Sequence, residues 1–235
     1  MEVDPRYTKD SVIVLFHDQT LDRTSTGQGN VSDYTYSELM ELKLKDTEGN
    51  VTDYTIPTLA EALEWARGKT VLVLDQKDVP VEERVRMVQE HQAKTSAIVM
   101  AYSLRDAQRI YELDPDIMMQ VFMPDEEAVA RFDASGVPWE NIIAFVTHKP
   151  LNEEFKRTFR LINEKGAMAI IGTSRTIDRE YTTGAIDENE LALRYQELIQ
   201  SGANIIEADL GIEAGSAIEQ ISRAQSVKRI YFINE

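Results

Sequence analysis

The chain has 235 residues, of which 43% are hydrophobic and 28% charged, a composition typical of a globular domain with a full core. Its formal net charge of -16 argues against nucleic acid as a partner, because nucleic-acid binders normally carry a basic field. The chain has no cysteine, which excludes disulfides and thiol catalysis but fits a cytoplasmic, a periplasmic or a secreted location equally well. No apolar run has the length of a membrane span.

A predicted strand over residues 1–4 carries two carboxylates. Glu2 and Asp4 stand at positions i and i+2, so they face the same side of that strand. Two carboxylates so placed repel each other unless a cation lies between them, and oxygen-only ligands suit Mg²⁺ or Ca²⁺. A solvated pair on an edge strand is the alternative, and it is the better interpretation for an isolated pair.

The next predicted strand runs from Ser11 to Phe16 and leads to His17. A histidine at a strand end beside a metal site suits proton transfer near neutral pH. The alternative is a histidine bonded to a loop carbonyl. Asp18 and Arg23 are expected to buttress the following loop, which is rich in turn formers over residues 24–29 and lacks the Gly-Lys-Ser/Thr of a Walker-type phosphate loop.

A second helix-and-strand unit follows a short predicted helix at 36–42 and a polar loop at 46–54. Thr58 and Glu61 have the spacing of a capping box, and Gly68 would end the helix that they begin. The apolar run 71–74 is typical of a strand buried on both faces. Asp75 and Lys77 then share a face at its carboxyl end, where they form either an ordinary surface pair or a third cation ligand beside a phosphate-binding charge.

The rest of the chain alternates helices with strands, which indicates a parallel sheet with crossover helices. Seven principal strands are predicted, ending near Asp4, Asp75, Ala101, Phe122, Thr147, Gly172 and Glu207. The predicted helices cover residues 81–91, 104–113, 125–132, 153–165 and 188–200, and a last one lies near 216–224.

Several short motifs in the first third of the chain occur in a fixed order: Glu2-Val3-Asp4, His17-Asp18, Leu21-Asp22-Arg23-Thr24, Gly27-Gln28-Gly29, Pro57-Thr58-Leu59 and Asp75-Gln76-Lys77. Together they resemble the signature of the glycerophosphodiester phosphodiesterase family, and the resemblance is clear up to about Asp78. It implies an α/β fold of the TIM-type (β/α)₈ barrel class. A single domain would cover residues 1–235, with an insertion at about 19–57 that helps to shape the substrate pocket.

The resemblance also implies an activity, which is the hydrolysis of glycerophosphodiesters to glycerol 3-phosphate and an alcohol with a divalent cation, Mg²⁺ or Ca²⁺. Glu2, Asp4 and Asp75 would hold the metal, His17 would be the general acid, and Lys77 would bind phosphate. The partner would be a small-molecule phosphodiester. The alternatives are a related phosphodiesterase that acts on a phospholipid or a cell-wall polymer, and a non-catalytic barrel that binds phosphoesters.

Three departures from the family pattern bear on these expectations. The family has a His-Arg-Gly motif on its first strand, and the printed sequence has none, so we expect either that this chain lacks the first strand or that it is a variant. Asp75 stands where the family usually has Glu, and the shorter arm would shift the metal. An aromatic Trp-Thr stretch is absent near Arg175, which leaves Arg175 as a substrate contact. His148 is expected either in the pocket or in a loop role.

Overall fold

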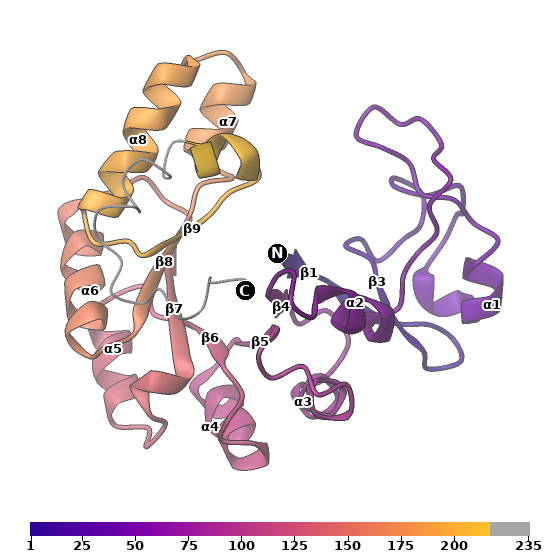
Figure 1. Ribbon diagram of the computed structural model, residues 1–235, viewed down its shortest axis with the longest axis horizontal. Coiled ribbons are helices and arrows are strands. Elements are labelled where there is room, and N and C mark those ends of the chain that lie inside the picture. The colour runs from indigo at the N-terminus through magenta and orange to yellow at the C-terminus, as the bar shows by residue number, and fades with distance from the viewer. Residues whose placement is uncertain (217–235) are drawn as a thin grey trace. The chain divides into compact units, whose positions relative to one another are not determined.

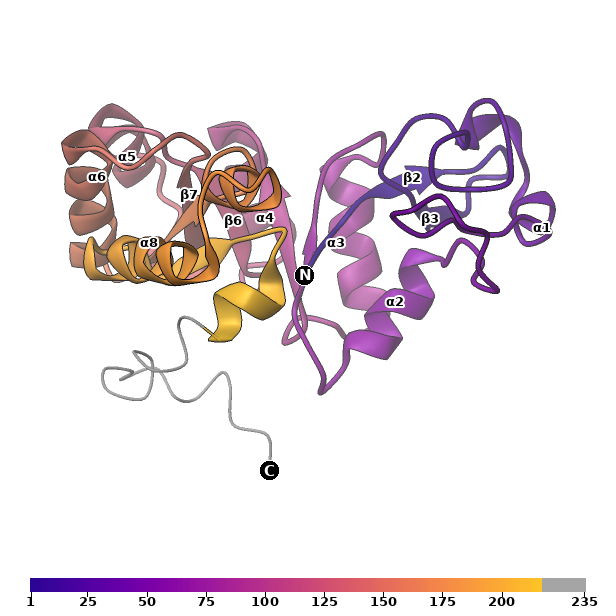
Figure 2. The ribbon, with the colours of Figure 1, turned by 90° about the horizontal axis from the view of Figure 1, so that it is seen from above.

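The structure is a computed structural model that describes residues 1–216. It divides into two compact units, Met1–Met119 and Gln120–Glu235, which are described separately. Figures 1 and 2 show the first unit in indigo to magenta and the second in pink to yellow. No helix in the described part of the chain is both long enough and apolar enough to cross a membrane.

Seven parallel strands form the main sheet, with neighbours in the order β1-β4-β5-β6-β7-β8-β9. This confirms the α/β class and the seven strands expected from the alternating pattern. The strands of the sheet are β1 (Glu2–Val3), β4 (Leu72–Leu74), β5 (Ala97–Ala101), β6 (Met119–Phe122), β7 (Ile142–Thr147), β8 (Met168–Gly172) and β9 (Ile205–Glu207). Every residue of β7 is buried, as the apolar character of such strands predicts.

The helices of the first unit are α1 (Tyr36–Leu39), α2 (Leu59–Ala66), α3 (Val81–Glu90) and α4 (Leu104–Leu113). Helices α3 and α4 pack on β5 and on each other, and Figure 2 shows α2 beside α3. The predicted capping box of α2 is confirmed: the Thr58 hydroxyl accepts from the Glu61 N–H, and the Glu61 carboxylate accepts from the Thr58 N–H. Gly68 has a φ of 69° just after the helix, a conformation that favours glycine.

In the second unit α5 (Glu126–Asp133), α6 (Glu153–Glu164), α7 (Ile177–Thr182) and α8 (Glu188–Gln200) alternate with the strands. Helix α7 was not predicted, because it has six residues and its N-cap residue Thr176 makes no side-chain capping bond. The predicted helix at 36–42 is shorter than expected and ends at Leu39. The helix expected at 216–224 lies outside the described residues, apart from Ser216.

A separate antiparallel ribbon joins β2 (Pro5–Tyr7) to β3 (Ile13–Leu15). The segment that follows it contains the predicted insertion and has a small core of its own. Buried Leu21, Val31, Leu39 and Ile56 from the insertion pack there with Val14 and Phe16 from the ribbon. The ribbon and the insertion therefore form a folded element beside the strand end of β1, which positions His17. The expectation of one domain over 1–235 stays a prediction.

Candidate active site

Three carboxylates meet in the first unit. Glu2 and Asp4 come from the end of β1, and Asp75 comes directly after β4. The two strands are parallel neighbours, with Val3 opposite Leu74, so their carboxyl ends lie at the same edge of the sheet. One oxygen atom from each carboxylate lies within 4.8 Å of one from each of the others. The cluster joins the three residues that the sequence predicted as metal ligands.

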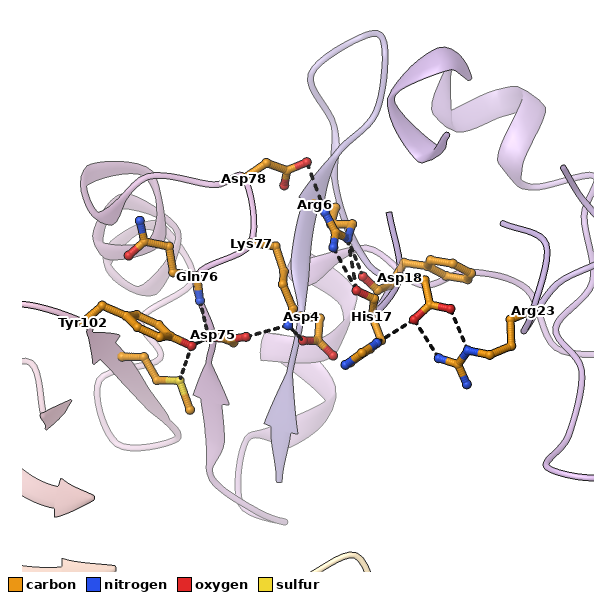
Figure 3. Close-up of polar contacts among 12 residues, drawn as sticks. Asp4, Arg6, His17, Asp18, Arg23, Asp75, Gln76, Lys77, Asp78 and Tyr102 are labelled. Carbon is orange, nitrogen blue, oxygen red and sulfur yellow. Dashed lines mark hydrogen bonds and ion pairs between the residues drawn. The ribbon is translucent and has the colours of Figure 1, made fainter. Parts of the chain in front are cut away.

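Lys77 lies between two of these carboxylates (Figure 3). Its Nζ is 2.9 Å from Asp4 Oδ1 and 2.8 Å from Asp75 Oδ2. Desolvation opposes protonation of Lys77, but hydrogen bonds to Asp75 and Asp4 outweigh it and raise the pKa of the lysine. Desolvation also opposes ionisation of Asp75, and hydrogen bonds from Lys77, Tyr102 and the Gln76 N–H lower its pKa overall. Asp75 is thus ionised and Lys77 charged at neutral pH.

Glu2 has no ion pair with Lys77 in the described part of the chain, unlike Asp4 and Asp75. Desolvation, followed by repulsion from Asp4 and Asp75, raises the pKa of Glu2 to about 8. Asp4 Oδ1 is buried, and the partner that the structure describes for it is Lys77 Nζ at 2.9 Å. One lysine therefore does not saturate the three carboxylates. Three carboxylates that converge beside one lysine form an oxygen-only donor set with excess negative charge, which fits a hard divalent cation.

His17 is tied to this cluster through the main chain. The Phe16 N–H donates to the Asp4 carbonyl at 2.9 Å, so His17 comes one residue after the contact with Asp4. The Arg6 guanidinium donates to the carbonyls of Phe16 and His17 at 3.0 and 2.9 Å, and it also faces Asp78 just beyond Lys77. These contacts fix the main chain at His17, while the imidazole itself is 66% exposed.

The side chain of His17 is oriented by a charged pair. Its Nδ1 is 2.7 Å from Asp18 Oδ1, and Arg23 donates to both oxygens of Asp18 at 2.6 and 2.8 Å (Figure 3). The hydrogen bonds from Arg23, followed by that with His17, hold the pKa of Asp18 well below its usual range. Nε2 of His17 is therefore the ring atom left for proton exchange. The sequence predicted Asp18 and Arg23 only as loop supports.

Two further residues of the site were not predicted. The Tyr102 hydroxyl donates to Asp75 Oδ1, and the fully buried Arg84 donates to the carbonyls of Leu74 and Met100. A signal for each exists in the sequence. Tyr102 directly follows the predicted strand that ends at Ala101, and Arg84 is the charged residue on the apolar face that α3 builds from Val81, Val85 and Val88.

The remaining candidates lie in the second unit. His148 follows β7 and packs against Phe145. A Cβ at Gly172 would lie 2.1 Å from His148 Nδ1, so a larger residue there would displace the imidazole. Desolvation, followed by the charge of Arg175, lowers the pKa of His148. Arg175 and His148 therefore lie close enough to interact, whereas the three carboxylates belong to the first unit. Arg175 as a substrate contact stays a prediction.

The comparisons with known proteins agree with this fold. A parallel α/β sheet that carries acidic groups and a histidine at its strand ends defines the class of α/β-barrel proteins with an acidic site at the carboxyl edge. The model of the glycerophosphoryl diester phosphodiesterase family matches residues 1–203. The chain belongs to that family.

Individual relatives agree with the family match. A glycerophosphoryl diester phosphodiesterase structure from Parabacteroides distasonis is 42% identical, covers 97% of this chain and 78% of its own, and has a TM-score of 0.89. A phosphodiesterase from Oleispira antarctica, solved in complex with sn-glycerol-3-phosphate, is 19% identical with a TM-score of 0.67, over 93% of this chain and 84% of its own. The second of these two structures bears on the fold alone.

Curated relatives match over a shorter region. A glycerophosphodiester phosphodiesterase from Caldanaerobacter subterraneus subsp. tengcongensis is 33% identical over 47% of this chain and 50% of its own. A match in Bacillus subtilis is 34% identical over 50% of this chain and 51% of the relative. The chain thus spans about half the length of these curated relatives.

Proposed function

We propose that this chain hydrolyses glycerophosphodiesters to glycerol 3-phosphate and an alcohol, with a divalent cation bound at Glu2, Asp4 and Asp75. The observation that carries the proposal is the convergence of these carboxylates within 4.8 Å, beside Lys77 and next to an oriented histidine. Family membership supports the substrate class.

Each residue has a distinct role in the proposed reaction. A divalent cation at the three carboxylates, Mg²⁺ or Ca²⁺, would supply Lewis-acid polarisation and orient the substrate. Lys77 provides a positive charge for the phosphate oxygens, and Arg175 is the candidate for a second polar contact. His17 acts as the general acid that protonates the leaving alkoxide through Nε2. Asp18 and Arg23 hold the imidazole in place, in the manner of other carboxylate–histidine pairs.

Hydrolysis of glycerophosphocholine, with and without a chelator, tests this proposal. We expect chelator-sensitive turnover by the wild type and a loss of about 10²–10⁴-fold in kcat for His17→Asn, the usual contribution of a general acid. His91→Asn is the matched control, because His91 lies at the C-terminal end of α3 near Glu64, away from the carboxylates. Equal turnover by His17→Asn and His91→Asn would remove His17 from the mechanism.

A non-catalytic phosphoester-binding function is the second candidate. A binding protein would take up glycerol 3-phosphate in calorimetry and show no turnover of glycerophosphocholine. Turnover by the wild type that is lost on chelation and on His17→Asn would exclude this candidate.

A further inference from the structure

The two oxygens of Asp75 have different partners. Oδ1 accepts from the Tyr102 hydroxyl and lies 2.6 Å from the Gln76 N–H, whereas Oδ2 faces Lys77 Nζ at 2.8 Å. A carboxylate with one oxygen held by two donors has little freedom to rotate, because each rotamer change would break both bonds. Figure 3 shows Tyr102 on one side of Asp75 and Lys77 on the other.

The pairing of β4 with β5 places the main chain of Tyr102 close to that of Asp75. Asp75 follows β4 and Tyr102 follows β5, and these strands are parallel neighbours with Leu74 opposite Val99. Arg84 Nη1 donates to the Leu74 carbonyl at 3.0 Å and to the Met100 carbonyl at 2.8 Å. Arg84 of α3 thus links the end of β4 to the end of β5. Arg84 is fully buried, and its Nε has no partner in the described part of the chain, so the bonds of Nη1 offset only part of the cost of burying the guanidinium.

Asp75 depends on such support because its side chain is short. One oxygen of Asp75 lies within 4.8 Å of an oxygen of Glu2 and of Asp4, and Oδ2 is the oxygen that shares Lys77 Nζ with Asp4 Oδ1. Rotation of Asp75 about χ2 would exchange its oxygens and move the one that faces the cluster. The hydroxyl of Tyr102 reaches Oδ1 from the neighbouring strand, and so favours the orientation that keeps Oδ2 in the cluster.

We propose that Tyr102 is a positioning residue, which sets the affinity of the three-carboxylate cluster for a divalent cation by fixing the orientation of Asp75. This proposal rests on the proposed function, since it takes the cluster to be a cation site. Groups that hydrogen-bond to a metal ligand typically change metal affinity by about 10–100-fold when they are removed. Tyr102 itself would touch neither the ion nor the substrate.

Calorimetric titration of the full chain with Mg²⁺ alone and with Ca²⁺ alone tests the proposal. Tyr102→Phe removes the hydroxyl and keeps the ring, so we expect Kd to rise by about 10–100-fold. Tyr111→Phe is the matched control on α4, where the tyrosine is half-buried, and its Kd should equal that of the wild type. Asp4→Asn, which removes a proposed ligand, should bind neither ion.

A second measurement separates positioning from a general loss of structure. Thermal denaturation in chelator should give Tyr102→Phe the same Tm as Tyr111→Phe, while the added cation raises its Tm less than that of the wild type. An unchanged Kd for Tyr102→Phe would overturn the role of Tyr102 and leave the cation site intact. A Kd that rises only together with a fall of the Tm in chelator would also overturn it. A wild type that binds neither ion would overturn both this proposal and the proposed cation site.

Discussion

Ionisation of Glu2 is disfavoured in the folded chain. Its pKa in the folded chain is about 8, against an ordinary value of 4.5, because of desolvation and the neighbouring carboxylates. A carboxyl group whose pKa is raised on folding binds its proton more tightly in the folded state. Its contribution to stability is therefore full below about pH 4.5 and falls as the pH rises toward 8.

This gives a prediction for the chain in chelator. The free energy of unfolding of the wild type should decrease between pH 4.5 and pH 8 relative to that of Glu2→Gln, which cannot ionise. Urea denaturation of the two proteins at several pH values measures the difference. Parallel pH curves for the wild type and Glu2→Gln would show that Glu2 ionises freely. A saturating divalent cation should reduce the slope, because it favours the ionised carboxylate.

The sequence predicted the residues of the site that depend on local spacing. Glu2 with Asp4, and Asp75 with Lys77, are pairs at i and i+2 at the carboxyl ends of β1 and β4, and extended geometry indicates that the two members of each pair face the same side. Tyr102, after β5, contacts Asp75, after β4, at a sequence separation of 27 residues. Arg84 of α3 contacts Leu74 of β4 at a separation of 10 residues. Those contacts depend on which strands are neighbours and in what register, which no short spacing reveals.

The α2 capping box supports a prediction on stability. Thr58→Ala removes the hydroxyl that accepts from the Glu61 N–H at 3.1 Å and should cost about 1 kcal/mol in the free energy of unfolding. Thr47→Ala, in the exposed loop after α1, is the control and should change it by less than about 0.5 kcal/mol. Equal stabilities of Thr58→Ala and the wild type in urea denaturation would mean that other contacts determine where α2 begins.

Two arginines of α3, one buried and one exposed, allow a comparison of their contributions to the free energy of unfolding. Arg84→Met keeps much of the side-chain volume but leaves the carbonyls of Leu74 and Met100 without their donor, and we expect a loss of at least about 2 kcal/mol. Arg86→Met, two residues away, breaks ion pairs with Glu83 and Glu90 on an exposed face and should cost at most about 1 kcal/mol. Chemical denaturation measures both, and a smaller loss for Arg84→Met than for Arg86→Met would contradict this account.

Periodicity predicted most helices and strands of the fold. Strand β7 and helices α4 and α8 have the predicted bounds, because each is long and has a continuous or periodic apolar pattern. Helix α7 was missed for the opposite reason, since it is short and lacks a side-chain cap. The 36–42 helix was predicted too long because Leu42 packs on the small core of the insertion after the helix has ended, so its apolar character reflects that core.

The net charge of -16 affects how ion binding must be measured. An acidic chain is stabilised by any salt, because ions screen its self-repulsion. Specific binding to the folded state instead saturates, and contributes about 2.7 kcal/mol when the ion is at 100 times its Kd. Both effects raise Tm, so stabilisation alone does not identify a site.

We therefore predict two components in the response of the wild type to Mg²⁺ or Ca²⁺. The saturable component should vanish in Asp4→Asn and persist in Asp53→Asn, which has the same change of charge in the exposed insertion. The screening component should be the same in all three proteins and in NaCl of equal ionic strength. Thermal denaturation at increasing ion concentrations separates them, and a saturable response retained by Asp4→Asn would place the ion elsewhere.

The two ends of the insertion lie close together within the first unit. The Phe16 N–H bonds to Asp4, the Leu15 N–H bonds to Pro57, and Val14 pairs with Thr58. The segment between His17 and Thr58 is thus a closed loop whose core also includes Val14 and Phe16, and lengthening a closed loop adds little to its entropic cost. In protein engineering, a segment from a relative could be grafted between these two points. A graft that keeps Asp18, Arg23 and the apolar residues that pack on Val14 and Phe16 should leave the carboxylates, Lys77, His17 and the start of α2 in their places.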